Sequence, residues 1–246
     1  MREDGAMPPP ARYREIAPPP AWQGRVRRLW RYRAAETASG PERILPDGCI
    51  DLIWDGQRLF VAGPDRVAAD AAIAPGSVLT GLRLAPGVAH GWLGTSMEAL
   101  TGQRVELREL WGKRAQALAS SLAVDTRSTA RLLLDALPDT AADARMAWLF
   151  ARLSSGDPPR LRELARQLAM SERALRRHCL AHFGYGPKTL DRILRLQRLL
   201  ASAHTQRTLT DAALAAGYAD ASHLVHDARD LTGLAPRELL RAHGHG

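Results

Sequence analysis

One pattern of apolar residues, glycine and proline occurs twice in the last ninety or so residues of the chain. Leu161 and Ala165 recur 48 residues later as Leu209 and Ala213. Four further positions recur 49 residues later, where Leu175, Cys179, Gly184 and Pro187 match Leu224, Ala228, Gly233 and Pro236. A repeat this close to 50 residues indicates that one supersecondary unit is used twice.

Each copy has the spacing of two short helices joined by a tight turn. In the first copy the apolar residues between 161 and 168 follow the i, i+3, i+4, i+7 spacing of an amphipathic helix. Ser171 is the predicted N-cap of a second helix, and Gly184 is its predicted end. Asp220 and Gly233 occupy the same positions in the second copy. This is the helix-turn-helix shape, whose second helix enters the major groove of DNA.

The segment between the copies is predicted to be one longer helix that begins at Pro187. Its apolar stripe consists of Leu190, Ile193, Leu194, Gln197, Leu200 and Ala201. The basic residues Lys188, Arg192, Arg195 and Arg198 lie off that stripe. We expect a rigid spacer that holds the two second helices about one turn of DNA, ~34 Å, apart and turns its basic side to phosphate.

The positive charge of the chain is concentrated in the same region. Residues 160–207 contain eleven Arg or Lys and three acids, a net +8 that equals the net charge of all 246 residues. Residues 208–246 carry three Arg and five acids. Because a solvated surface usually mixes both signs, the block predicts a surface that faces nucleic-acid phosphate.

These features resemble the AraC/XylS family of bacterial transcription regulators. The resemblance rests on "LARQLAMSERALRR", "FGYGPKTLDRILRLQR", "AALAAGYADASHL" and "TGLAPREL". It implies seven helices that form two helix-turn-helix units and a linking helix. It also implies a sequence-specific transcription regulator of the cytoplasm that binds double-stranded promoter DNA, and RNA polymerase if it activates.

The resemblance places the DNA-reading positions on the second helix of each unit. In the first unit they are Arg173, Arg176 and Arg177, and arginine pairs bidentately with guanine. In the second unit they are Ala221, Ser222, Val225 and His226, of which we expect Ser222 and His226 to reach bases. Phosphate contacts are expected from Ser171, Lys188, Arg192, Arg195, Arg198 and Arg229.

The second unit departs from the family pattern. His226 stands where the family usually has arginine, and Ala228 stands at an aromatic core position, as Cys179 does in the first unit. Asp220, Asp227 and Asp230 make this helix acidic. We therefore expect the first unit to supply most of the affinity and the base reading.

The N-terminal half has the composition of strands and turns. "CIDLIW", "RLFVAG" and "SVLTGLRL" are short, rich in branched residues and bounded by turn sequences. The phrases "LPDGCIDLIW", "VAGPD", "GLRLAPG" and "LRELWG" resemble the small β-rich N-terminal domain of one AraC subgroup. Such a domain commonly senses a small molecule or mediates pairing.

The predicted fold class is therefore α+β. We expect a disordered tail at 1–20, an effector or dimerisation domain at 21–137, a connecting helix at 138–156 and the DNA-binding domain at 157–246. The Pro triplets of the tail argue against a signal peptide, and no run of about 18 apolar residues predicts a membrane helix. The sequence leaves both a monomer and a homodimer open.

Trp54, Arg83, His90 and Trp92, with Trp111 beside them, could line an effector pocket. The simpler interpretation is that each tryptophan fills the core of a small β domain. A third hypothesis keeps the N-terminal domain as a dimerisation platform that binds no ligand.

Metal and enzyme chemistry are not expected. His178 and His182, and likewise His223 and His226, have the spacing of a zinc-binding pair, but no third and fourth ligand follows at matching spacing. An alkyl-transfer repair protein with this DNA-binding fold would need a reactive cysteine and a cysteine-rich zinc site. Cys179 falls on an apolar helix face and Cys49 stands alone, so we expect no enzyme, metal or cofactor.

Overall fold

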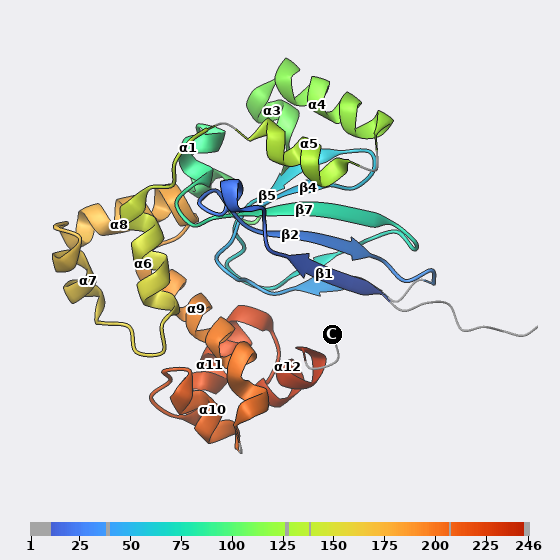
Figure 1. Ribbon diagram of the computed structural model, residues 1–246. Helices are drawn as coiled ribbons and strands as arrows, with labels where there is room; N and C mark the ends of the chain where they lie inside the picture. Colours follow the sequence, from blue (N-terminus) through green and yellow to red (C-terminus); the bar gives the residue numbers. More distant parts are fainter. Residues whose placement is uncertain (1–10, 38–39, 126–127, 138, 207, 244–246) are drawn as a thin grey trace, which may run out of the picture.

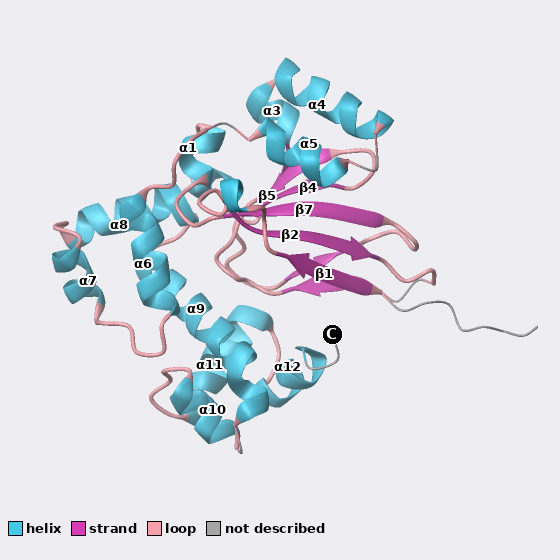
Figure 2. Ribbon diagram, viewed as in Figure 1, coloured by secondary structure: helices cyan, strands magenta, loops and turns pink. Residues whose placement is uncertain are grey.

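Strands dominate the first part of the chain and helices the rest (Figures 1 and 2). The computed structural model describes residues 11–37, 40–125, 128–137, 139–206 and 208–243. The predicted α+β class is confirmed.

The strands are β1 (Arg12–Ile16), β2 (Val26–Arg33), β3 (Glu42–Ile44), β4 (Asp51–Trp54), β5 (Leu59–Ala62), β6 (Ala69–Ala71), β7 (Val78–Leu84) and β8 (Arg104–Glu106). Six of them form an antiparallel sheet in the order β1-β2-β7-β4-β5-β8, and β3 pairs with β6. The three strands expected from "CIDLIW", "RLFVAG" and "SVLTGLRL" are β4, β5 and β7, at the centre of the sheet.

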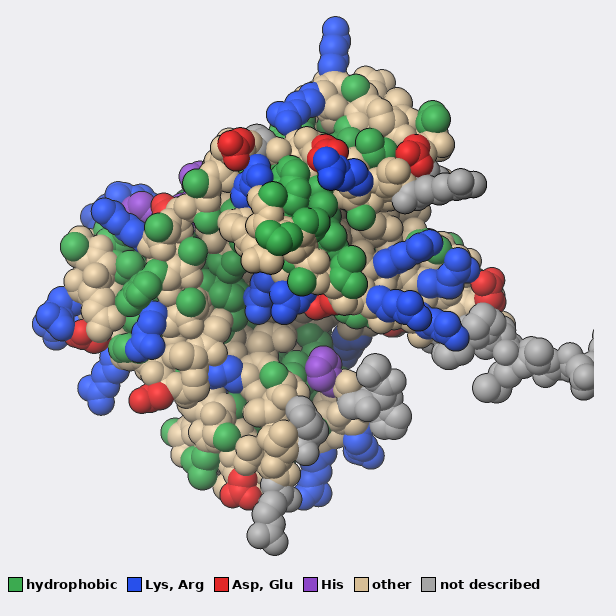
Figure 3. Space-filling view, viewed as in Figure 1, with side chains coloured by type: hydrophobic (Ala, Val, Ile, Leu, Met, Phe, Trp, Pro, Cys, Tyr) green, Lys and Arg blue, Asp and Glu red, His purple; other side chains and the backbone are tan. Residues whose placement is uncertain are grey.

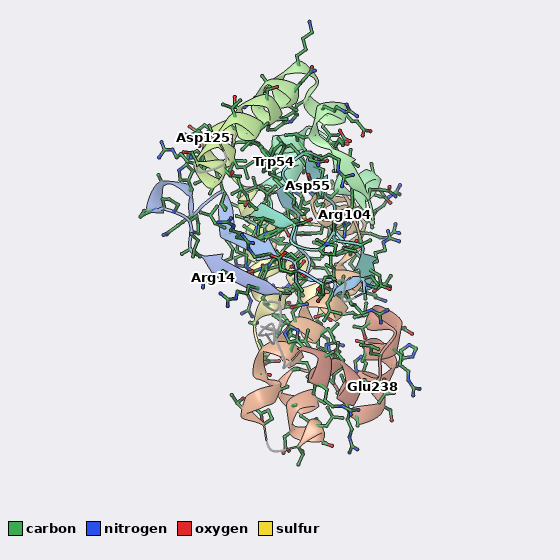
Figure 4. The ribbon with its side chains drawn as sticks, turned by 90° about the vertical axis from the view of Figure 1, so that its right-hand side faces the viewer. Arg14, Trp54, Asp55, Arg104, Asp125 and Glu238 are labelled. Carbon is green, nitrogen blue, oxygen red and sulfur yellow. The ribbon has the colours of Figure 1, made fainter. Side chains whose placement is uncertain are left out.

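The N-terminal part also contains the 3-10 turn η1 (Pro20–Trp22) and the helices α1 (Ala89–Leu93), α2 (Met97–Leu100), α3 (Leu107–Trp111), α4 (Lys113–Val124) and α5 (Thr129–Ala136). Helices α3, α4 and α5 lie over one face of the sheet (Figure 1). Leu52 and Leu82 of the sheet share a buried core with Leu122 and Leu133 of these helices. Trp54 lies in this layer and is 4% exposed (Figure 4).

The predicted disordered tail is wrong in part, because Arg12–Ile16 forms the edge strand β1. All five residues of β1 are exposed, so neither hydrophobicity nor alternation marks the strand in the sequence. Its ladder with β2, from Arg12 opposite Arg33 to Ile16 opposite Leu29, holds it in place. Residues 1–10 of the predicted tail lie outside the described residues.

The helical part consists of α6 (Ala144–Ser154), α7 (Leu161–Gln167), α8 (Glu172–Phe183), α9 (Pro187–Ser202), η2 (Ala203–Thr205), α10 (Leu209–Ala215), α11 (Ala221–Thr232) and α12 (Pro236–His243). Helices α7 and α8 form the first predicted helix-turn-helix unit, α10 and α11 form the second, and α9 joins them. The predicted seven-helix arrangement is α6 to α12.

The predicted ends of the two second helices are confirmed. Ser171 caps α8 by accepting a hydrogen bond from Ala174 N, and Asp220 caps α11 by accepting one from His223 N. Gly184 and Gly233 follow these helices in the left-handed conformation, with φ of 80° and 73°. The local sequence therefore determines where both helices begin and end.

The predicted connecting segment 138–156 contains α6, which is more than a linker. Met146, Leu149, Phe150 and Leu153 of α6 are buried in the same core as α7 to α12. Asp143 caps α6 by accepting hydrogen bonds from Arg145 N and Met146 N. Helix α6 is thus a structural part of the helical domain.

The sheet domain contacts the C-terminal ends of both second helices. Beyond α8, the carbonyl of Gly184 accepts hydrogen bonds from Thr101 Oγ1 at 3.0 Å and Arg66 Nη2 at 3.3 Å. At the end of α11, Leu231 O accepts from Ala68 N at 2.7 Å. Arg43 Nη1 donates to the carbonyl of the next residue, Thr232, at 3.3 Å. The two helices thus end on the same domain, which links their positions to each other.

Candidate nucleic-acid interface

Helix α8 presents three arginines to solvent. Arg173, Arg176 and Arg177 are all exposed, while Leu175 and Cys179 of the same helix are buried. The apolar residues of α8 lie four positions apart, so they share one face of the helix, and this face packs inward. The arginines therefore lie on the outer face. Within the described chain, none of the three has a hydrogen bond or ion pair to another side chain. Their guanidinium groups are therefore available to a ligand.

The surface around these arginines is also basic. Arg160, Arg162 and Arg166 are exposed at α7, and Lys188 is exposed at the start of α9. Figure 3 shows Lys and Arg side chains gathered over α7 and α8. Of the basic residues on α7, Arg166 pairs with Glu163 at 2.7 Å. At α7 and α8 the basic block of the sequence therefore forms an outward-facing surface, as a phosphate-binding face requires.

Helix α11 presents a different surface. Ala221, Ser222 and His226 are exposed and Val225 is half-buried, so the predicted reading positions do face outward. His226 Nε2 lies 3.2 Å from Asp230 Oδ2 on the same helix. Arg229 is exposed as well. With a single arginine beside several acids, α11 offers less positive charge to a phosphate backbone than α8.

The arginines of α9 are bonded within the fold. Arg192 donates to Asp227 Oδ1 at 2.8 Å and to Asp230 Oδ2 at 2.9 Å, both on α11. Arg195 is 14% exposed and bonds to Asp191 and to His223 Nε2. These arginines hold α9 against α11, and the acids of α11 are their partners.

Arg198 is also engaged within the fold. Its guanidinium donates to the carbonyl of Leu153 at the end of α6 and, at 3.1 Å, to that of Ala216 after α10. Burial lowers the pKa of this arginine. These internal bonds argue against the predicted phosphate contacts of Arg192, Arg195 and Arg198. Leu196 and Leu199 of α9 are also buried, although they lie outside the predicted apolar stripe. More of the surface of α9 is therefore buried than the stripe predicts.

The other three predicted phosphate contacts are Ser171, Lys188 and Arg229. Lys188 and Arg229 are exposed, and Ser171 lies at the N-terminus of α8, where its hydroxyl is already the helix cap. Backbone N–H groups at a helix N-terminus attract phosphate on their own account. These three contacts stay predictions.

A second basic surface was missed from the sequence. Arg12 and Arg14 of β1 lie opposite Arg33 and Arg31 of β2, and all four are exposed. Figure 3 shows a matching group of Lys and Arg side chains at that end of the sheet. Residues 11–33 contain seven Arg and one Glu, but the sequence does not show that the two ends of this segment lie side by side. The cross-strand register is what brings the four arginines together.

The residues predicted to line an effector pocket do not lie together in the fold. Trp54 and Trp92 are buried in the core beneath α3 to α5, and Trp92 packs edge-on against Trp111 at 4.8 Å. His90 lies on α1, with Nδ1 2.9 Å from the carbonyl of Thr95. Arg83 alternates with the buried Leu82 and Leu84 of β7 and therefore points to the other face of the sheet. The tryptophans are core residues.

Arg83 instead lines a cavity between the two domains. The cavity has a volume of about 290 Å³ and is lined by Glu15, Arg27, Arg28, Asp47, Cys49, Arg83, Ser154, Leu194, Gln197, Arg198 and Ala201. Arg83 forms ion pairs with Glu15, Asp47 and Asp51 at 3.1, 3.2 and 3.3 Å. Burial raises the pKa of Asp51 to about 6, and Arg83 opposes that rise. The cavity is therefore a charged, partly enclosed site.

Neither cysteine has the environment of a nucleophile. Cys179 is fully buried in the helical core, as its position predicts, and burial raises the pKa of its thiol to about 12. Burial also raises the pKa of Cys49, with Asp47 adding to the effect. A reactive thiol needs the opposite shift, because the thiolate is the attacking species. This environment argues against alkyl-transfer chemistry at either residue.

The fold supplies a third candidate metal ligand. Asp143, at the start of α6, has a carboxylate oxygen near His178 and His182 of α8, and one ligand atom of each lies within 4.8 Å of the others. Burial, and secondarily His90, lower the pKa of His182, whereas Asp143 raises it. Spacing along the sequence could not reveal Asp143, because a different helix carries it.

None of the described helices combines the length and the hydrophobicity of a membrane-spanning segment.

Comparisons with known proteins match each domain separately. A family model described as a helix-turn-helix domain matches residues 164–242, and a model described as a domain of unknown function, DUF6597, matches residues 14–106. No curated protein sequence matches significantly.

Two similar solved structures are of ToxT from Vibrio cholerae. An apo variant from strain SCE256 is 12% identical, with a TM-score of 0.46 over 86% of this chain and 96% of that chain. ToxT from strain O395 is 9% identical, with a TM-score of 0.43 over 94% of this chain and 96% of that chain.

Proposed function

We propose that this chain, in which a helix-turn-helix domain follows a DUF6597 domain, is a transcription regulator of the AraC/XylS type. It is proposed to recognise a specific operator chiefly through α8. Arg173, Arg176 and Arg177 are the proposed base-reading residues. The observation that carries the proposal is the outward, unpaired position of these three arginines on the second helix of a helix-turn-helix unit. Arginine in that position reads guanine O6 and N7 in the major groove.

The second unit is proposed to position the protein more than to read bases. Ser222 and His226 face outward on α11 and remain the proposed contacts there. Phosphate contacts are proposed for Ser171, Lys188 and Arg229, together with the exposed arginines of α7. The arginines of α9 are proposed to act indirectly, by holding the two units at a fixed spacing of about one DNA turn.

A small-molecule effector is proposed to bind in the interdomain cavity. Its lining combines Arg27, Arg28 and Arg83 of the sheet domain with Leu194 and Arg198 of α9, so an occupant would contact both domains. The sheet domain in turn contacts the ends of α8 and α11. A ligand that changes the docking of the domains would therefore change the relative position of the two DNA-contacting helices.

DNA selection from a random pool tests the DNA-binding proposal. The purified full chain should enrich one sequence motif with guanines in the half-site that α8 contacts, and its affinity should fall steeply with added salt. Genomic footprinting with the same protein would then identify the promoters. Enrichment of no motif, with binding that salt alone controls, would refute sequence-specific recognition.

A thermal-shift screen of metabolites tests the effector proposal, because a ligand that binds only the folded form raises Tm. Arg27→Ala, in the lining of the cavity, should remove the shift, and Arg14→Ala, on the exposed edge strand, should keep it. A shift that survives Arg27→Ala would place the effector elsewhere. A screen without any hit would favour the alternative of a ligand-independent dimerisation platform.

A further inference from the structure

Three side chains that commonly bind metals converge at the C-terminal half of α8. His178 and His182 are one turn apart, and their rings stack 6.4 Å apart with 13° between the ring planes. Asp143 approaches them from the N-terminus of α6, so one ligand atom of each lies within 4.8 Å of the other two. Two histidines at i and i+4 with a carboxylate from another element form a common zinc ligand set.

The two oxygens of Asp143 have different surroundings. Oδ1 accepts hydrogen bonds from Arg145 N at 2.9 Å and Met146 N at 3.0 Å, which fixes the carboxylate as the cap of α6. Oδ2 lies 3.7 Å from His182 Nε2, beyond hydrogen-bond distance. The carboxylate is therefore held rigidly with one oxygen turned towards the histidines, as outer contacts hold a metal ligand.

His182 supplies a second, independent observation. Its side chain is only 8% exposed, and its Nδ1 makes no hydrogen bond of normal geometry among the described residues, although the backbone of Gly87 approaches the ring. Buried ring nitrogens are normally paired, so this one needs an explanation. The ring of His90, from α1 of the sheet domain, lies edge-on to that of His182 at 4.7 Å. A third imidazole thus lies beside the pair on α8.

We propose that Asp143, His178 and His182 bind a divalent transition-metal ion of the zinc type, with a fourth position open to water or His90. Nitrogen donors select Zn²⁺ and similar ions over Mg²⁺ and Ca²⁺, which prefer sites made of oxygen. The bound ion joins α8 to α6 at the boundary with the sheet domain. It therefore fixes the C-terminal half of α8 without using the exposed arginines.

Zinc titration of the EDTA-treated, dialysed full chain tests the site. Calorimetry should show one saturable equivalent of Zn²⁺, and Co²⁺ should give the visible absorption of a tetrahedral site. Zn²⁺ at 100 times its Kd should raise Tm by roughly 5–10 °C. His178→Ala and Asp143→Asn should weaken binding by at least about 10–100-fold, the loss that follows even removal of an outer-shell partner.

The matched control is His226→Ala, which removes a histidine from the other recognition helix and should leave zinc affinity unchanged. Equal Tm values of the metal-free proteins would establish that His178→Ala and Asp143→Asn remain folded. Equal zinc affinity in His178→Ala, His226→Ala and the unaltered chain would overturn the proposal, because the ion would then bind elsewhere. Failure to bind any saturable equivalent would overturn it as well.

Discussion

The two helix-turn-helix units share one backbone plan but present different surfaces. In both turns an equivalent hydrogen bond closes the same loop, from Met170 N to Ala165 O and from Tyr218 N to Ala213 O, each at 2.9 Å. Yet α8 exposes three unpaired arginines, whereas α11 uses its acids to bind the arginines of α9. Similarity of fold therefore does not imply an equal share in DNA binding.

The difference also shows why a basic segment is not in itself a DNA-binding surface. The arginines of α9 add positive charge to the sequence block, but the partners of Arg192 lie far along the chain on α11. Acids within the fold neutralise Arg192 and Arg195, and Arg198 bonds to backbone carbonyls. Of this basic block, the exposed charge of α7 and α8 is what remains for a polyanion.

The largest expected effect concerns the buried acid of the second unit. The side chain of Asp227 is 3% exposed and lies 2.8 Å from Arg192 and 3.8 Å from Arg195, so Asp227→Ala removes the buried carboxylate that both arginines face. We expect a loss of about 3–5 kcal/mol in the free energy of unfolding, measured by urea denaturation. Asp230→Ala, at a 45% exposed side chain, should cost only about 0–1 kcal/mol. Equal losses in the two variants would contradict a buried ion-pair network.

The second comparison concerns the glycines that end the two helices. A Cβ on Gly184 would lie 2.3 Å from Thr101 Oγ1 and 2.9 Å from Met97 O. On Gly233 the nearest atom would be Arg43 Nη1, at 3.8 Å. Gly184→Ala combines the cost of a left-handed residue with overpacking and should destabilise the fold by about 2–4 kcal/mol. Gly233→Ala should cost only about 1–2 kcal/mol.

Thermal and urea unfolding of both glycine variants measure this difference, which reports how closely the sheet domain approaches the end of α8. If the two substitutions destabilise equally, the sheet domain does not press on Gly184 in solution.

The third comparison concerns DNA affinity. Arg176→Ala should cost about 1–3 kcal/mol and relax specificity at one base pair, because the guanidinium is exposed and unpaired. His226→Ala should cost much less, since His226 already pairs with Asp230. Fluorescence anisotropy against the selected operator and its single-base variants measures both. A uniform loss on every sequence would make Arg176 a phosphate contact instead.

Local rules predicted much of the helical domain. Ser171, Asp220, Gly184 and Gly233 act within one or two turns of their own position, so a cap or a helix end can be recognised from neighbouring residues alone. The periodicity of α7, α8 and α11 likewise identified their buried faces. The same reasoning identified the three central strands, whose residues are mostly apolar.

Long-range partners account for what the sequence did not predict. Nothing near Arg192 in the sequence indicates Asp227, and nothing near His178 indicates Asp143. Strand β1 is exposed along its whole length and is defined only by its ladder with β2. The predicted pocket separated for a local reason, since alternation along β7 places Arg83 on the opposite face from the tryptophan-lined core.

The smallest expected effect compares the turns themselves. Ala169 has a φ of +52°, in the left-handed region, where the equivalent position of the second unit has Gly217 with a φ of +89°. A residue with a Cβ costs about 1–2 kcal/mol there, while glycine adds about 0.5–1 kcal/mol of backbone entropy to the unfolded chain. Ala169→Gly should therefore stabilise the protein by about 0.5–1 kcal/mol. Urea denaturation should show this as a higher midpoint at an unchanged m-value.

Gly217→Ala is the reciprocal substitution and should destabilise by a similar amount or more, because its Cβ would also approach Arg198 Nη2 to 3.3 Å. Stability changes of opposite sign in the two variants would establish that both turns impose the same backbone conformation. The first unit would then contain a strained alanine at the position where the second unit has glycine. A destabilising Ala169→Gly would mean that the first turn relaxes away from the left-handed region. The units would then differ in backbone as well as in surface.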